Sequence, residues 1–322
     1  MNIDPIVIVP GEPKSIFFEI FFKSLKKIRI VSPLILICSN NLFKGEAKKF
    51  NFKNKIEVLD RKYFKAKPLL RKKIYLINVE LKTHKISIKK RHLINQYIKE
   101  CFKISFELIN NGCSKKFING PIIKENFLSR KYLGITEYLG HKFQVNKIGM
   151  LIFNEKLSVC PLTTHLPVSQ VSKKISVKSI VEKILLIHDF YVKKFFFKPK
   201  IGVLGLNPHC ESKLKFNEDK EIILKAIHHS KLKKINVKGP FPADTFFMKD
   251  NRNNYDVALG MYHDQVLTPL KTLYEYDAIN ITMGLPFMRV TPDHGPNTKM
   301  VDKNISNPNS LIKCLKFLNK SV

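Results

Sequence analysis

Short apolar runs alternate with stretches of helical periodicity along this chain, and that alternation limits the fold more than any other feature. The run at 33–39, PLILICS, is apolar almost throughout, as expected of a strand buried on both faces of a sheet. The stretch at 179–195 instead repeats its apolar residues at helical spacing. Because such strands and helices alternate to the end of the chain, the sequence predicts an α/β fold with a largely parallel sheet.

Length and composition place the chain among globular proteins. Its 322 residues are enough for two domains, and its hydrophobic content of 44% excludes general disorder. No run of about 20 apolar residues predicts a membrane span. The opening segment at 7–25 has the pattern of a strand, a turn and a helix, and not of a signal peptide. The six cysteines form no CxxC pair, so we expect reduced thiols and a cytoplasmic location.

The formal net charge of +31 raises the alternative of a nucleic-acid-binding protein. Most of that charge is lysine, spread from end to end and not clustered with aromatic residues on one segment. Abundant lysine, isoleucine, asparagine and phenylalanine, with no tryptophan, are typical of proteins from AT-rich genomes. We therefore expect no specific nucleic-acid partner, although anionic substrates would be attracted to so basic a protein.

Three histidines share one context. His165, His209 and His263 each follow an apolar strand and sit beside turn-forming residues. Ligands in open α/β sheets bind beyond the carboxyl ends of the strands, so three imidazoles from such ends can converge on one divalent metal. Zinc suits three nitrogens best, with cobalt, manganese and magnesium as alternatives. Asp244 and Asp264 are candidates to orient the imidazoles. The spacing alone is not diagnostic, and three unrelated structural histidines are the alternative.

A second polar group follows the third histidine. Lys271, Asn280 and Arg289 supply an ammonium, an amide and a guanidinium, which together suit a phosphate or carboxylate. Ordinary loop polarity is the alternative, but a retained arginine in a lysine-biased chain favours a need for its planar shape. No GxGxxG sequence is present, so the standard Rossmann site for dinucleotides is not supported.

Several ordered motifs resemble the 4-hydroxythreonine-4-phosphate dehydrogenase family. They are TTHLPVSQV, LGLNPHCE, GPFPADTFF, MYHDQVLTPLK and NITMGLPFMRVTPDHG, preceded by NGPIIKENF and GITEYL. VPGEPKSIFFE looks like a degraded form of that family's GDPAGIGPE. The resemblance implies a fold like that of isocitrate and isopropylmalate dehydrogenases, with two α/β/α domains and a cleft. We expect a discontinuous first domain at 1–125 plus 280–322 and a second domain at 126–279 that carries the histidines.

The resemblance also implies a reaction. NAD or NADP would oxidise the C3 hydroxyl of 4-phosphohydroxy-L-threonine, and the 3-oxo acid would lose CO2 to give 3-amino-2-oxopropyl phosphate, in pyridoxal 5′-phosphate biosynthesis. It implies a homodimer with the active site at the subunit interface, and one divalent metal (zinc, cobalt or magnesium). The residues that bind the dinucleotide are not identified. The implied metal ligands are His165, His209 and His263; the implied substrate contacts are Thr136, Lys271, Asn280 and Arg289; the candidate bases are Lys271 and Asp264.

The chain departs from the family pattern at several positions. Ile135 stands where the family has a histidine, Glu211 replaces a glycine, and Ser15 and Phe17 replace glycines of the first turn, which must therefore be reshaped. Losing one substrate donor costs about 1–3 kcal/mol, which predicts a weakened enzyme and not an inactive one. The alternatives are an inactive relative that survives as a binding protein, and a dehydrogenase for another phosphorylated hydroxy acid.

Overall fold

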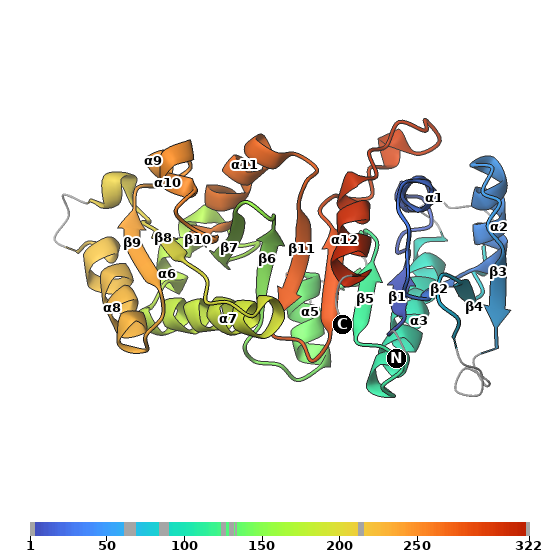
Figure 1. Cartoon of the computed structure of the whole chain (residues 1–322), viewed down its shortest axis with the longest axis horizontal. Helices are drawn as coiled ribbons and strands as arrows, with labels where there is room; N and C mark the ends of the chain where they lie inside the picture. Colours follow the sequence, from blue (N-terminus) through green and yellow to red (C-terminus); the bar gives the residue numbers. More distant parts are fainter. Residues whose placement is uncertain are drawn as a thin grey trace. The chain divides into compact units, whose positions relative to one another are not determined.

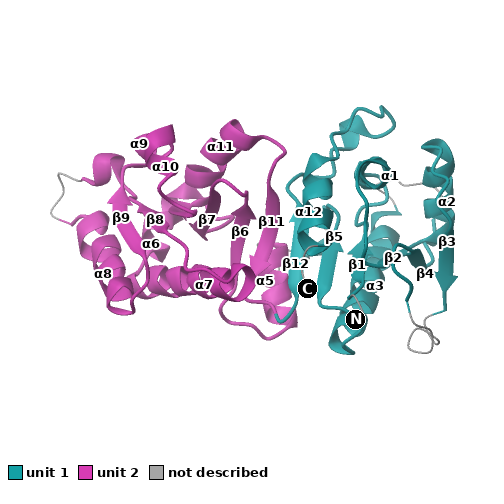
Figure 2. Cartoon of the chain, viewed as in Figure 1, with its two compact units in different colours: residues 1–132, 286–322 teal, residues 133–285 magenta. Residues whose placement is uncertain are grey.

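The computed structural model describes residues 4–60, 69–83, 90–123, 127–128, 132, 134–211 and 216–319. The chain divides into two compact units, shown in Figure 2. Unit 1 combines residues 1–132 with residues 286–322, and unit 2 spans residues 133–285. Both limits fall a few residues later than the positions expected from the sequence, at 125/126 and 279/280.

Unit 1 is built on parallel strands in the order β3-β4-β2-β1-β5-β12. The apolar runs of β1 and β2 are buried along their whole length, which confirms the prediction of strands covered on both faces. Its elements are β1 (Ile6–Val9), α1 (Phe17–Lys27), β2 (Leu34–Cys38), α2 (Asn40–Lys49), β3 (Ile56–Leu59), β4 (Ile74–Asn78), α3 (Arg91–Asn110), β5 (Lys116–Asn119), β12 (Met288–Pro292), η6 (Thr298–Met300) and α12 (Asn309–Asn319).

The turn after β1 depends on one glycine. Gly11 has a φ of +83°, in the left-handed region, and a Cβ there would lie 2.3 Å from the carbonyl oxygen of Pro121. The Ser15 hydroxyl donates to the Glu12 carbonyl at 2.7 Å and closes the turn. Phe17 then begins α1 fully buried and with an ordinary negative φ. The expected reshaping of this turn relative to the family stays a prediction.

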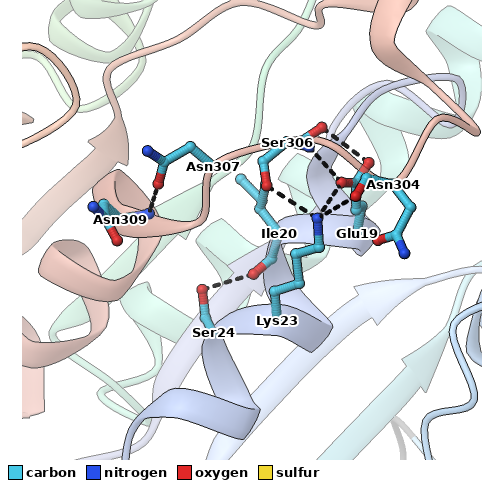
Figure 3. Close-up of polar contacts among 8 residues, drawn as sticks. All are labelled: Glu19, Ile20, Lys23, Ser24, Asn304, Ser306, Asn307 and Asn309. Atoms are coloured by element: carbon cyan, nitrogen blue, oxygen red, sulfur yellow. Dashed lines mark hydrogen bonds and ion pairs between the residues drawn. The ribbon is translucent and has the colours of Figure 1, made fainter.

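Helix α1 fixes the segment that leads into α12, as Figure 3 shows. The buried Glu19 carboxylate accepts from the Ser306 backbone N–H at 2.6 Å and from the Ser306 hydroxyl at 2.9 Å. The Lys23 ammonium donates to Glu19 at 2.7 Å and to the carbonyl of Asn304 at 2.9 Å. A buried carboxylate is stable when its lone pairs are paired in this way, so the two sequence segments of unit 1 are held together.

Unit 2 has the strand order β11-β6-β7-β10-β8-β9. Strands β7, β10, β8 and β9 are parallel, and β6 runs antiparallel to β7 and β11. Helix α11 packs on β7 and β10, and Figure 1 shows it above that part of the sheet. No helix among the described residues is both long and apolar enough to cross a membrane.

The bounds of the unit 2 elements are as follows. They are α5 (Ile135–Lys142), β6 (Gly149–Phe153), β7 (Ser158–Thr163), η3 (Val168–Gln170), α6 (Val171–Lys174), α7 (Val177–Phe195), β8 (Ile201–Leu204), η4 (Pro208–Cys210), η5 (Asp219–Leu224), α8 (Lys225–Leu232), β9 (Val237–Phe241), α9 (Ala243–Phe246), α10 (Lys249–Arg252), β10 (Val257–Tyr262), α11 (His263–Tyr274) and β11 (Ile279–Met283).

The close approach of two loops in unit 1 generates a stability prediction. A Cβ on Gly120 would lie 2.0 Å from the carbonyl oxygen of Pro10, an overlap with backbone that no side-chain rotation relieves. We expect Gly120→Ala to lower the free energy of unfolding by about 2 kcal/mol or more, measured by urea denaturation. Gly45→Ala is the matched control, because open space surrounds Gly45 within α2 and the substitution should raise stability by about 0.5–1 kcal/mol. Equal effects of the two substitutions would contradict this packing.

Candidate active site

Two of the predicted metal ligands lie next to each other at the carboxyl ends of neighbouring strands. Thr163 on β7 is in register with Tyr262 on β10, so His165 and His263 emerge side by side. Their ring centroids are 6.0 Å apart with planes inclined at 35°. A histidine nitrogen binds zinc at about 2.0–2.1 Å, so the centroids of two rings that share one tetrahedral ion lie about 5 Å apart. The two rings are therefore near neighbours, and sharing one ion requires them to move about 1 Å closer.

His209 stands apart from this pair. It lies in η4, five residues after the end of β8, and its side chain is exposed. Within the part of the chain that the structure describes, no three histidine, cysteine, aspartate or glutamate residues are grouped closely enough to hold a metal. The structure thus brings together His165 and His263, and the participation of His209 stays a prediction.

Two of the histidines have unusual backbone conformations. His165 has a φ of +54° and His209 a φ of +55°, both in the left-handed region. Such a conformation costs about 1–3 kcal/mol in a residue with a side chain, and it persists where the surroundings impose it. Ten other described non-glycine residues, among them Lys72 and Phe196, also have a positive φ, so this conformation does not by itself mark a functional site.

A carboxylate that the sequence did not assign to the site lies beside His165. Glu137 on α5 accepts from the Thr164 hydroxyl at 2.9 Å, and its second oxygen is buried without a hydrogen-bond partner among the described residues. A Cβ on Gly134 would lie 2.6 Å from that oxygen and 2.7 Å from Cε1 of His165. Glu137 and His165 are thus packed against the same glycine. The position of Glu137 in the GITE motif is the sequence feature that could have assigned it to the site.

Asp264 contacts the neighbouring histidine directly. Its Oδ1 lies 2.6 Å from Nδ1 of His263. A carboxylate on one ring nitrogen fixes the tautomer and leaves the other nitrogen available to a metal. The expected orienting role of Asp264 therefore has a geometric basis. Asp244, the other candidate, is exposed on α9.

The predicted substrate residues of unit 2 come from three elements. Thr136 is the second residue of α5, Lys271 lies in the last turn of α11, and Asn280 lies on β11. Oδ1 of Asn280 is buried and has no hydrogen-bond partner among the described residues. Because buried polar atoms in folded proteins are nearly always paired, an acceptor left open in this way is a good candidate for a ligand contact. Beside Thr136, Ile135 is buried.

Arg289, the predicted substrate residue of unit 1, is buried on β12 with 3% of its surface exposed. Its Nε donates to Oδ1 of Asn119 at 2.9 Å, and Asn119 in turn donates to the carbonyl of Gly120 at 2.9 Å. Burial raises the pKa of the Cys314 thiol, an effect that the nearby Arg289 guanidinium partly opposes. The Asn119 contact fixes the Nε edge of the Arg289 guanidinium, whose planar shape suits an anion.

Comparison with known proteins identifies relatives over nearly the whole chain. The family profile described as pyridoxal phosphate biosynthetic protein PdxA matches residues 29–318. A 4-hydroxythreonine-4-phosphate dehydrogenase from Sulfurihydrogenibium sp. is 32% identical and covers 97% of this chain and 96% of its own length. The crystal structure of a 4-hydroxythreonine-4-phosphate dehydrogenase from Klebsiella pneumoniae superimposes with a TM-score of 0.83 at 26% identity, covering 99% of this chain and 98% of that one.

A further relative carries a different substrate in its name. A protein from Oceanobacillus iheyensis named for D-threonate 4-phosphate dehydrogenase is 34% identical over 67% of this chain and 66% of its own length. The predicted fold class, α/β and similar to isocitrate and isopropylmalate dehydrogenases, is confirmed by these matches.

The contact between Asp264 and His263 generates a metal-binding prediction. We expect Asp264→Asn to weaken cobalt(II) binding about tenfold, measured by isothermal titration calorimetry, because the ring loses the carboxylate that orients it. The melting temperature should change by less than about 2 °C, since the Asp264 side chain is 79% exposed. Asp189→Asn makes the same change on the exposed face of α7 and serves as the control. Equal affinities of the two variants would show that Asp264 does not act on the metal.

Proposed function

Since this chain belongs to the pyridoxal phosphate biosynthetic protein PdxA family, we propose that it is a 4-hydroxythreonine-4-phosphate dehydrogenase, an oxidoreductase of pyridoxal 5′-phosphate biosynthesis that depends on NAD or NADP and on a divalent metal. It oxidises the C3 hydroxyl of 4-phosphohydroxy-L-threonine to a ketone. The resulting 3-oxo acid loses CO2 and yields 3-amino-2-oxopropyl phosphate. The observation that carries the proposal is the approach of His165 and His263 at the ends of β7 and β10.

The metal ligands in this proposal are His165, His209 and His263. A divalent ion bound by them would lower the pKa of the substrate hydroxyl and polarise the product ketone. Zinc, cobalt and magnesium are the candidate ions, and imidazole nitrogens favour the first two. Asp264 holds the ring of His263 in one tautomer, and Gly134 leaves room for the ring of His165.

The remaining residues of the proposal bind substrate or move its proton. Thr136, Lys271, Asn280 and Arg289 are the proposed contacts to phosphate, carboxylate and hydroxyl groups, which fix the substrate so that the reacting carbon is correctly placed. Oδ1 of Asn280 is an unpaired buried acceptor, which suits a hydroxyl or ammonium group of the substrate and not its phosphate or carboxylate. Lys271 and Asp264 are the candidate bases that remove the hydroxyl proton as hydride leaves for the nucleotide.

Assembly and location complete the proposal. We expect a homodimer with the active site at the subunit interface. A cytoplasmic location is supported by the six cysteines, all of which are free thiols in the structure. The substrate is a phosphorylated small molecule, for which the high positive charge of the chain is favourable.

A second candidate substrate is D-threonate 4-phosphate. The relative from Oceanobacillus iheyensis is named for this compound, which carries a hydroxyl where 4-phosphohydroxy-L-threonine carries an amino group. Ile135 supports a substrate pocket that differs from that of the family, because a buried apolar side chain stands where the family pattern has a histidine. Pocket shape sets the choice between such substrates.

The deciding experiment measures NADH formation by metal-stripped protein, with and without added zinc, cobalt or magnesium. We expect metal-dependent turnover of 4-phosphohydroxy-L-threonine. The loss of one donor at position 135, where Ile135 stands, should slow it by a factor of about ten to a hundred and fifty. Faster turnover of D-threonate 4-phosphate in the same assay would favour the second candidate. No turnover of either substrate by folded, metal-loaded protein would contradict the proposal and favour an inactive relative that acts by binding.

A further inference from the structure

The loop that carries His209 begins where two parallel strands separate. Strands β8 and β10 are paired from Ile201 opposite Val257 to Val203 opposite Leu259. Beyond that point β8 continues into the loop at 205–210 and β10 continues towards His263. Backbone groups that leave a sheet ladder in the interior need other partners, because an unpaired buried donor or acceptor costs about 1–3 kcal/mol.

Gln265 supplies those partners with a single side-chain amide. Its Nε2 donates to the carbonyl of Gly205 at 2.7 Å, and its Oε1 accepts from the backbone N–H of Met261 at 2.7 Å. The amide thus replaces one backbone hydrogen-bond pair between the diverging strands β8 and β10. Gln265 is also two residues from His263, so one short segment carries a predicted ligand and the contact to the loop of another.

Asp219 holds the same loop from another side. Its buried carboxylate accepts from the N–H of Leu206 at 2.7 Å and from the N–H of Asn207 at 3.2 Å. The Asn207 side-chain amide donates to it as well, at 2.8 Å. Three consecutive residues, 205–207, are therefore fixed by side chains from η5 and α11.

We infer that Gln265 and Asp219 are positioning residues that hold residues 205–207, the start of the His209 loop, in a fixed relation to the segment that carries His263, and that these contacts support the proposed metal site. Neither residue would touch the ion or the substrate. They lower the entropic cost of metal binding, because a mobile loop must be ordered each time a metal binds. The inference rests on the proposed metal site and adds to it the residues that preorganise the site.

Gln265→Glu tests the inference with the least change in size. The new carboxylate still accepts from Met261, but it has no N–H for the Gly205 carbonyl and repels it. We expect cobalt(II) affinity to fall about tenfold or more, followed by calorimetry and by the visible spectrum of the bound cobalt. An added negative charge would by itself attract a cation, so a loss of affinity reports the broken contact and not electrostatics.

Controls separate positioning from folding and from charge. Gln96→Glu makes the same chemical change on the exposed face of α3 and should leave cobalt affinity unchanged. Gln265→Met removes both hydrogen bonds at similar volume without a charge and should weaken binding in the same direction. Melting temperature and near-ultraviolet circular dichroism verify that each variant is folded. If Gln265→Glu does not fold, the neutral variant Gln265→Met provides the test.

The outcomes distinguish the inference from the function on which it rests. Wild-type protein that binds cobalt, with weaker binding in both Gln265 variants, supports the inference. Wild-type protein that binds cobalt, with the same affinity in the folded Gln265 variants, overturns the inference and leaves the proposed function intact. Wild-type protein that binds no cobalt overturns the proposed metal site and the inference together.

Discussion

The need to pair backbone groups beyond the carboxyl ends of parallel strands governs this structure. Inside the sheet the backbone N–H and C=O groups of neighbouring strands pair with each other, but groups in the loops that follow need other partners. Those loops are also where ligands bind in α/β proteins. Side chains must therefore satisfy the backbone without filling the site. In unit 2 this task falls to Gln265 and Asp219 at residues 205–207, and His263 lies two residues before Gln265.

Unit 1 meets the same constraint with different groups. The Glu12 carboxylate is buried after β1, where it pairs with the Arg91 guanidinium and accepts from the N–H of Ile123 at 3.1 Å. Asn119 at the end of β5 links the Gly120 carbonyl to the guanidinium of the buried Arg289. Charged groups buried in this way are stable because each is paired, and they keep their orientation for the same reason.

The sequence predicts those features that depend on local pattern. The apolar run at 33–39 is a buried strand, as expected, because burial on both faces leaves a continuous apolar signal. His165 and His263 meet because each follows its strand within two residues. The position of His209 was not predictable in the same way, since five residues separate it from the end of β8. The path of that loop depends on Gln265, a contact between distant residues that leaves no periodic trace in the sequence.

The central claim is that histidines at the strand ends of unit 2 bind one divalent ion. The most direct measurement is X-ray absorption spectroscopy of the cobalt-loaded protein at one equivalent of metal. The account predicts an inner shell that contains nitrogen from at least two imidazoles, with their outer-ring scattering, at about 2.0–2.1 Å. An inner shell of oxygen alone, without imidazole scattering, would contradict it.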